Sequence, residues 1–213
     1  MPPTELTTST TDAVLAIECV IVIAILRRSA MVDRWRTGLW SLVFGLIAFS
    51  SFLGAVIHGF EMPNSIRAAL WKPLYLSLGI CIALVLVGAV YDWRGRLIAG
   101  RLIPWGIGVG IVFFGLTEFL HGGFMVFVAY EAAATVSALA IYSRLAATHR
   151  LKGAGVVSAA ILLSLAAAGV QASDVSVRIV FPFDHNGIFH LVQMVSIGIL
   201  GLGLRMGMQP DAK

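Results

Sequence analysis

Long apolar runs separated by short polar stretches recur along the whole chain. A helix needs about 20 predominantly apolar residues to cross a bilayer, and these runs reach about that length. We therefore predict an all-α integral membrane bundle of seven transmembrane helices, forming a single domain over residues 1–213 with flexible tails at 1–11 and 208–213. The predicted helices are Asp12–Leu26, Gly38–Phe60, Leu70–Tyr91, Leu102–Leu120, Phe124–Ala146, Gly153–Gln171 and Asn186–Met206.

The composition agrees with a membrane protein and argues against a soluble domain. Hydrophobic residues make up 59% of the chain and charged residues 12%, whereas a soluble domain carries about 25% charged residues. The net charge of +4 does not indicate nucleic-acid binding, because the basic residues flank the apolar runs. We expect membrane lipid as the partner and no nucleic acid; the oligomeric state stays open.

The basic residues also predict an orientation. About 12 of the 15 Lys and Arg residues fall in the first, third and fifth predicted loops or after the last helix. Cytoplasmic loops carry the excess of Lys and Arg. The N-terminus is therefore expected outside and the C-terminus inside.

Polar residues gather where the last apolar run begins, in the segment FPFDHNGIFHLVQM from Phe181 to Met194. Residues three or four apart share one face of a helix, so Asn186, His190 and Gln193 form a stripe. His185 lies about 140° from His190 around the helix axis, so it joins this stripe only from the first turn.

The predicted topology places four of the five histidines at the outer end, together with several carboxylates. An ionisable side chain in the bilayer core costs about 2.5–3.5 kcal/mol or more, so it usually faces a partner or a wet cavity. We predict a shared outward-facing polar cavity. Its proton acceptors are Glu18 and Glu118. Apart from His58, His185 and His190, its other members are Asn186, Gln193, Ser51, His121, Glu131 and Asp184.

This set of side chains suits a metal ion. Imidazoles are good zinc ligands, catalytic zinc sites use three protein ligands plus water, and a nearby carboxylate takes the proton from that water. Glu118 and His121 have the Glu-x-x-His spacing of di-iron bundles. The chain has one such pair, which argues against a di-iron site.

Two short motifs resemble those of the alkaline ceramidase and progestin/adipoQ receptor superfamily. Gly54-Ala55-Val56-Ile57-His58 is similar to its Ser-x-x-x-His motif, and Asn186-Gly187-Ile188-Phe189-His190 to its His-x-x-x-His motif. The segment HNGIFHLVQM resembles an uncharacterised bacterial branch related to that superfamily. The serine and the first histidine are replaced here, and the superfamily's aspartate in the third helix has no counterpart, since Asp92 lies at the inner end.

The resemblance implies a seven-helix, zinc-dependent hydrolase of a lipid amide or ester in a bacterial inner membrane, with its site facing the periplasm. The implied zinc ligands are His58 and His190, with His185 or Asn186 as the third. One alternative is a non-catalytic lipid-binding, sensor or accessory protein that keeps the cavity. A third is a haem- or copper-binding protein using the same histidines. A retinal protein is excluded, because the seventh predicted helix has no lysine for a Schiff base.

Overall fold

The computed structural model describes residues 3–28, 33–119 and 123–209. This part of the chain forms seven helices, each long and apolar enough to cross a membrane. The prediction of an all-helical fold is thereby confirmed, and its composition is that of an integral membrane protein. The helices are α1 (Pro3–Arg28), α2 (Arg34–Gly59), α3 (Asn64–Arg94), α4 (Arg96–Phe119), α5 (Gly123–Ala147), α6 (Ala154–Gln171) and α7 (His185–Met206).

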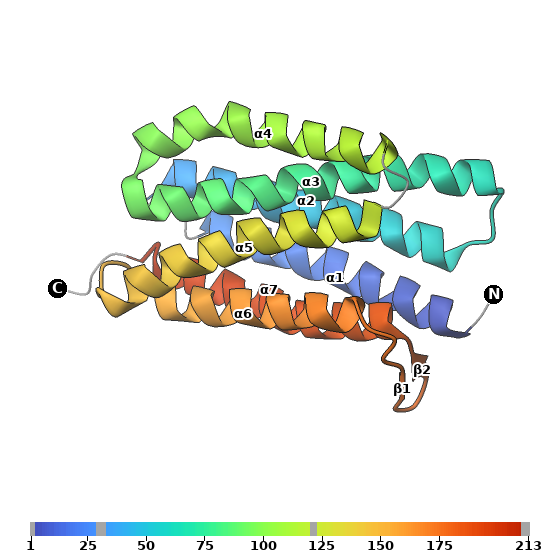
Figure 1. The fold of residues 1–213 in the computed structure, drawn as a ribbon. Coiled ribbons are helices and arrows are strands. Elements are labelled where there is room, and N and C mark those ends of the chain that lie inside the picture. Colours follow the sequence, from blue (N-terminus) through green and yellow to red (C-terminus); the bar gives the residue numbers. More distant parts are fainter. Residues whose placement is uncertain (1–2, 29–32, 120–122, 210–213) are drawn as a thin grey trace.

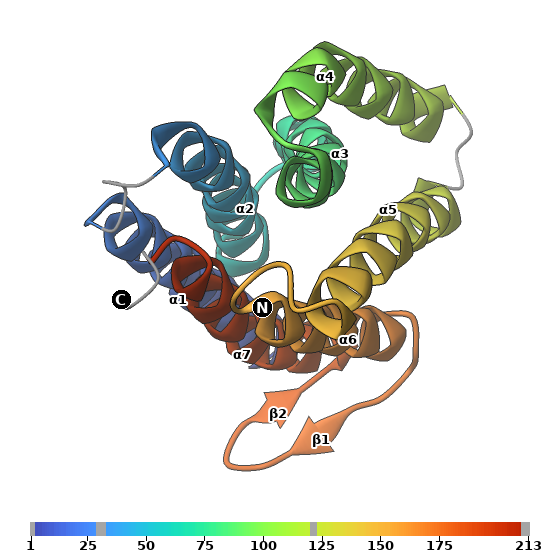
Figure 2. The same cartoon turned by 90° about the vertical axis from the view of Figure 1, so that its left-hand side faces the viewer.

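Six of the helices form a closed ring when the bundle is viewed along its axis (Figure 2). Around the ring, α1, α2, α3, α5, α6 and α7 pack against one another in that order, and α7 closes it against α1. Helix α4 lies outside the ring, against α3 and α5. This order makes α1 and α7 neighbours although they are far apart in the sequence.

The two ends of the bundle, which lie on opposite sides of Figure 1, carry different side chains. At one end α1 and α7 begin and α2 finishes, and we call it the histidine end because His58 and His190 lie towards it. An antiparallel hairpin of β1 (Val177–Arg178) and β2 (Pro182–Phe183) leads into α7 there. The opposite end, where α2 and α4 begin with Arg34 and Arg96, is the arginine end.

Helix α1 begins at Pro3, so residues 3–11 are helical and not the flexible tail that we predicted. The apolar run starts later, but the threonines before it have partners. Thr7 Oγ1 donates to the Pro182 carbonyl at 2.9 Å, and Thr8 Oγ1 to Asp184 Oδ1 at 3.1 Å. At the other terminus Met208 is buried, so the predicted tail from 208 does not start there; residues 210–213 lie outside the described ranges.

A buried ion pair joins four helices at the arginine end. Arg36 Nε lies 2.7 Å from Asp92 Oδ1, and Arg36 Nη2 donates to Asp92 Oδ2 at 2.8 Å. Tyr142 donates its hydroxyl to the same carboxylate at 2.7 Å, and Arg36 Nη1 donates to the Leu204 carbonyl at 3.3 Å. Two-point pairing with further hydrogen bonds compensates both buried charges, so Arg36 links α2 to α3, α5 and α7.

Candidate functional site

The polar residues of α1 at positions 5, 8, 11 and 12 follow helical spacing. Residues three and four apart lie on one face of a helix. This face meets the end of α2 and the start of α7, as the contacts of Glu5, Thr8 and Asp12 with those elements show. A polar seam therefore runs down α1 from the histidine end.

His190 is buried at the centre of this seam. Its Nδ1 lies 3.1 Å from Thr11 Oγ1, and its Nε2 lies 3.3 Å from Asp12 Oδ1. The Thr11 hydroxyl also lies within hydrogen-bond distance of the carbonyls of Thr7 and Thr8, both at 2.9 Å. The direction of the Thr11–His190 hydrogen bond follows the tautomer of the ring, and in either tautomer Nε2 faces the Asp12 carboxyl group.

An imidazole nitrogen and a carboxyl oxygen this close share either a hydrogen bond or a cation. Hydrogen bonds from N–H to O typically span about 2.7–3.2 Å, and the 3.3 Å between His190 Nε2 and Asp12 Oδ1 is slightly longer. Two ligands of one tetrahedral zinc, each bound at about 2.0–2.1 Å, lie about 3.3–3.4 Å apart. The separation of this pair is that of a long hydrogen bond, and it also equals the spacing of two ligands of one metal ion.

Gly54 of α2 makes room for Asp12. A Cβ atom at position 54 would lie 2.5 Å from Asp12 Oδ2, closer than any real contact of that kind. Position 54 is where the superfamily resembled by the sequence has its serine. In this protein the Asp12 carboxyl group from α1 lies against that position instead, and its residue is only 5% exposed.

His58 lies one turn further along α2 and pairs with a second carboxylate of α1. Its Nδ1 is 2.6 Å from Glu5 Oε2, and its ring stands edge-on to Trp71 with centroids 5.9 Å apart. Both members of this pair are partly exposed. His58 and His190 thus each have Nδ1 held by a side chain of α1.

Asp184 fixes the start of α7 and ties it to α1. Its Oδ1 accepts from the backbone N–H of Gly187 at 2.9 Å and from Thr8 Oγ1 at 3.1 Å. A carboxylate in the N-cap position satisfies backbone donors that the helix itself leaves without partners. This cap sets the direction in which α7 enters the bundle and presents His190 to α1.

The seam continues below His190 with two buried acceptor atoms. A Cβ at Gly198 of α7 would lie 3.2 Å from Glu18 Oε1, so the predicted proton acceptor does face α7. Glu18 Oε2 and Gln193 Oε1 are both buried and have no hydrogen-bond partner within the described ranges. Glu18 lies about 9 Å from Asp12 along the axis of α1.

Other predicted site residues lie elsewhere or further from the pair. Glu118 is on α4, outside the ring, and forms an ion pair with Lys72 at 3.2 Å. Glu131 is on α5, which does not adjoin α1 in the ring. Ser51 is buried on α2 one turn below Gly54, while His185 and Asn186 are half-buried in the first turn of α7. His121 lies outside the described residues.

The described ranges contain no group of three His, Cys, Asp or Glu side chains that could hold a metal ion as they stand. The geometry provides two His–carboxylate pairs, the buried His190–Asp12 pair and the more exposed His58–Glu5 pair nearer the end of the bundle. Zinc binding therefore stays a prediction.

Sequence analysis missed Asp12 together with Glu5, Thr8 and Thr11. Asp12 was taken as the first residue of an apolar helix, and the residues before it as a tail. The signal was present in the spacing of Glu5, Thr8 and Asp12, which puts three polar side chains on one helical face.

A family model described as "Family of unknown function (DUF6962)" matches residues 7–209. The chain belongs to this family. No curated protein and no solved structure matches the chain. The DUF6962 match includes Asp12, Gly54, His58 and His190, so the centre of the polar seam lies inside the region that defines the family.

Proposed function

We propose that this DUF6962 protein is a zinc-dependent hydrolase of a lipid amide or ester, embedded in a bacterial inner membrane. Its histidine end faces the periplasm, with the N-terminus outside and the C-terminus inside. The observation that carries the proposal is the buried His190–Asp12 pair, whose Nε2 and Oδ1 lie 3.3 Å apart. The seven apolar helices and the resemblance of the His58 and His190 motifs support the same function.

The proposed zinc site uses mixed nitrogen and oxygen ligands, and it requires a third donor to approach the His190–Asp12 pair, since no three donors are grouped within the described ranges. His190 and Asp12 are the first two ligands, and His58 supplies the third. Histidines that bind metal usually donate the other ring N–H to a carboxylate, carbonyl or similar acceptor. In the zinc-bound form Glu5 and Thr11 are the acceptors for the Nδ1–H groups of His58 and His190, and Nε2 of each ring is the ligand atom.

Bound zinc supplies an activated water molecule as nucleophile near neutral pH. The chain's own residues hold the site and exclude bulk solvent. Thr11 orients His190, Gly54 gives Asp12 its space, and Asp184 places the start of α7. Glu18 lies too far below Asp12 along α1 to reach the site directly. Proton exchange between Glu18 and the site therefore requires intervening water.

A non-catalytic lipid-binding or sensor protein is the second candidate. It is favoured by Gly54 and Asn186, which stand where the resembled superfamily has a serine and a histidine. Such a protein keeps the polar seam without cleaving a bond. Hydrolysis assays separate the two functions.

Metal analysis of the full chain, purified in detergent without chelators, tests the first step. We expect one zinc per chain in the wild type and strongly reduced zinc in Asp12→Asn and His190→Ala. Asp174→Asn makes the same charge change at an exposed position and should keep the metal. A wild-type protein that is folded and zinc-free overturns the metal site.

The same samples are then tested for release of fatty acid from lipid amides and esters in mixed micelles. Cleavage that is lost on zinc removal and restored by zinc supports the hydrolase. Stoichiometric zinc without cleavage of either class favours the non-catalytic function. An absorption spectrum with a Soret band indicates the haem-binding alternative.

A further inference from the structure

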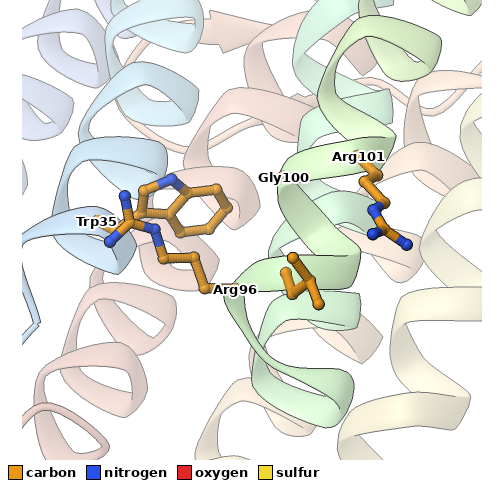
Figure 3. A pocket seen from close by; sticks show the side chains of 5 residues that line it. Trp35, Arg96, Gly100 and Arg101 are labelled. Carbon is orange, nitrogen blue, oxygen red and sulfur yellow. The ribbon is translucent and has the colours of Figure 1, made fainter.

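A shallow surface pocket of about 540 Å³ lies at the arginine end, far from the His190–Asp12 pair. It opens between the start of α2 and the start of α4 (Figure 3). Its lining residues are Trp35, Arg96, Leu97, Gly100 and Arg101.

Two exposed guanidinium groups flank this pocket. Figure 3 shows the Arg96 side chain extending towards the Trp35 ring, while Arg101 lies on the other side of Gly100. Within the part of the chain that the structure describes, neither arginine has an acidic partner, in contrast to Arg36, which is paired with Asp92. Both positive charges therefore remain available to an anion.

The Trp35 ring lines one side of the pocket, and Gly100 of α4 lines it without a side chain. Trp35 stacks on Tyr91 with ring centroids 4.7 Å apart and an interplanar angle of 21°, which holds the indole in place. An added Cβ at Gly100 would meet no atom within 4 Å. Tryptophan is typical of the membrane–water interface, where its ring lies at the level of the lipid head groups.

An exposed apolar track leads from the pocket along α4. Leu97 is 70% exposed and Trp105 is 74% exposed. From Trp105 the track continues away from the arginine end at spacings of three and four residues, and Leu97 precedes Trp105 by two helical turns, so all its members lie on one side of the helix. Its members are Leu97, Trp105, Val109, Val112 and Leu116.

We propose that this pocket binds the phosphate group of an anionic phospholipid. Arg96 and Arg101 donate to the phosphate oxygens, Trp35 packs against the glycerol region, and the acyl chains lie on the apolar track. Arginine pairs with phosphate through two parallel hydrogen bonds, and basic pockets between membrane helices on the cytoplasmic side are known to select lipid head groups. The apolar track favours a lipid over a soluble phosphate, because it places acyl chains of the bilayer directly beside the two arginines.

Lipid binding to the full chain is measured by native mass spectrometry from detergent, with phosphatidylglycerol and phosphatidylcholine as probes. We expect the wild type to prefer the anionic lipid. Replacing both arginines by glutamine should weaken that binding by about 25-fold, or about fivefold for each charge. Arg144→Gln with Arg150→Gln is the matched control, since both residues are exposed outside the pocket, and it should bind as the wild type does.

A second variant tests the pocket without changing its charge. Gly100→Phe fills the space between the arginines, and binding should fall as in the double arginine variant. Unchanged binding by Gly100→Phe, or equal loss in the control pair, overturns the proposal in favour of general surface charge. Displacement of the lipid by millimolar inorganic phosphate overturns it in favour of a soluble anion.

Discussion

At the residue scale, the position of Asp12 depends on the absence of a side chain on the neighbouring helix. Its Oδ2 occupies the space beside Gly54, and its Oδ1 faces His190. The Thr11 hydroxyl fixes the imidazole from the other side. One buried carboxyl group is thus positioned jointly by three helices, α1, α2 and α7.

Gly54→Ala should displace Asp12 and weaken zinc binding. The added Cβ would lie 2.5 Å from Asp12 Oδ2, so the carboxyl group has to move. Loss of correct ligand positioning typically costs about 10- to 100-fold in metal affinity, and we expect a loss of that size in competition with a chelator. Gly45→Ala on the same helix meets no atom within 4 Å and is the control. Equal affinity in both variants contradicts the role given to Asp12.

The sequence predicted some of these residues and missed others for identifiable reasons. His58, His190 and Asp184 follow from topology, because depth in the membrane can be counted along a helix. Glu118 was expected in the cavity because its depth is similar, but α4 lies outside the ring and Glu118 pairs with Lys72. Depth alone does not say which helices are neighbours.

At the scale of the elements, the apolar runs located all seven helices, but several of the helices extend beyond their runs. Helix α3 begins at Asn64 and α4 at Arg96, about six residues before the predicted starts. Polar caps explain part of this. At the start of α2, Asp33 Oδ1 accepts from the Arg36 backbone N–H at 2.9 Å. A backbone donor of the first turn therefore has a partner although this turn lies outside the apolar run.

The turn before α6 depends on Gly153. Its φ of 77° is left-handed, and an added Cβ would lie 2.2 Å from the backbone oxygen of Gly203 in α7. Gly153→Ala should therefore destabilise the fold by about 2–4 kcal/mol, since backbone strain and a backbone clash act together. Gly155→Ala meets only an ordinary contact at 3.9 Å and should be close to neutral. Thermal unfolding in detergent compares them, and similar midpoints would show that α6 and α7 can separate at no cost.

At the scale of the whole molecule, the orientation can be tested with cysteines. The native Cys19 and Cys81 are buried, so they should give a low background with a membrane-impermeant maleimide. Val180→Cys, in the hairpin at the histidine end, should be labelled on intact cells. Thr148→Cys, exposed at the arginine end, should be labelled only after the membrane is opened. The positive-inside rule gives this direction, and the reverse labelling pattern would contradict it.

The ring order was not predictable from the hydrophobic pattern. Apolar spacing gives the number of helices and their approximate positions along the chain. Because all the helices are similarly apolar, it does not indicate which of them pack together. Small residues contribute at close approaches, as at Gly110, where an added Cβ would lie 2.8 Å from the backbone of Ile80. The arrangement is set by such local fits summed over the whole bundle.

Because α1 and α7 close the ring, the His190–Asp12 pair can form only late in synthesis. Asp12 enters the bilayer with the first helix, whereas His190 is added only when the last one emerges from the ribosome. Every shorter nascent chain holds a carboxyl group without its imidazole partner. Formation of the buried His190–Asp12 pair is therefore coupled to completion of translation, and a prematurely terminated chain lacks this pair.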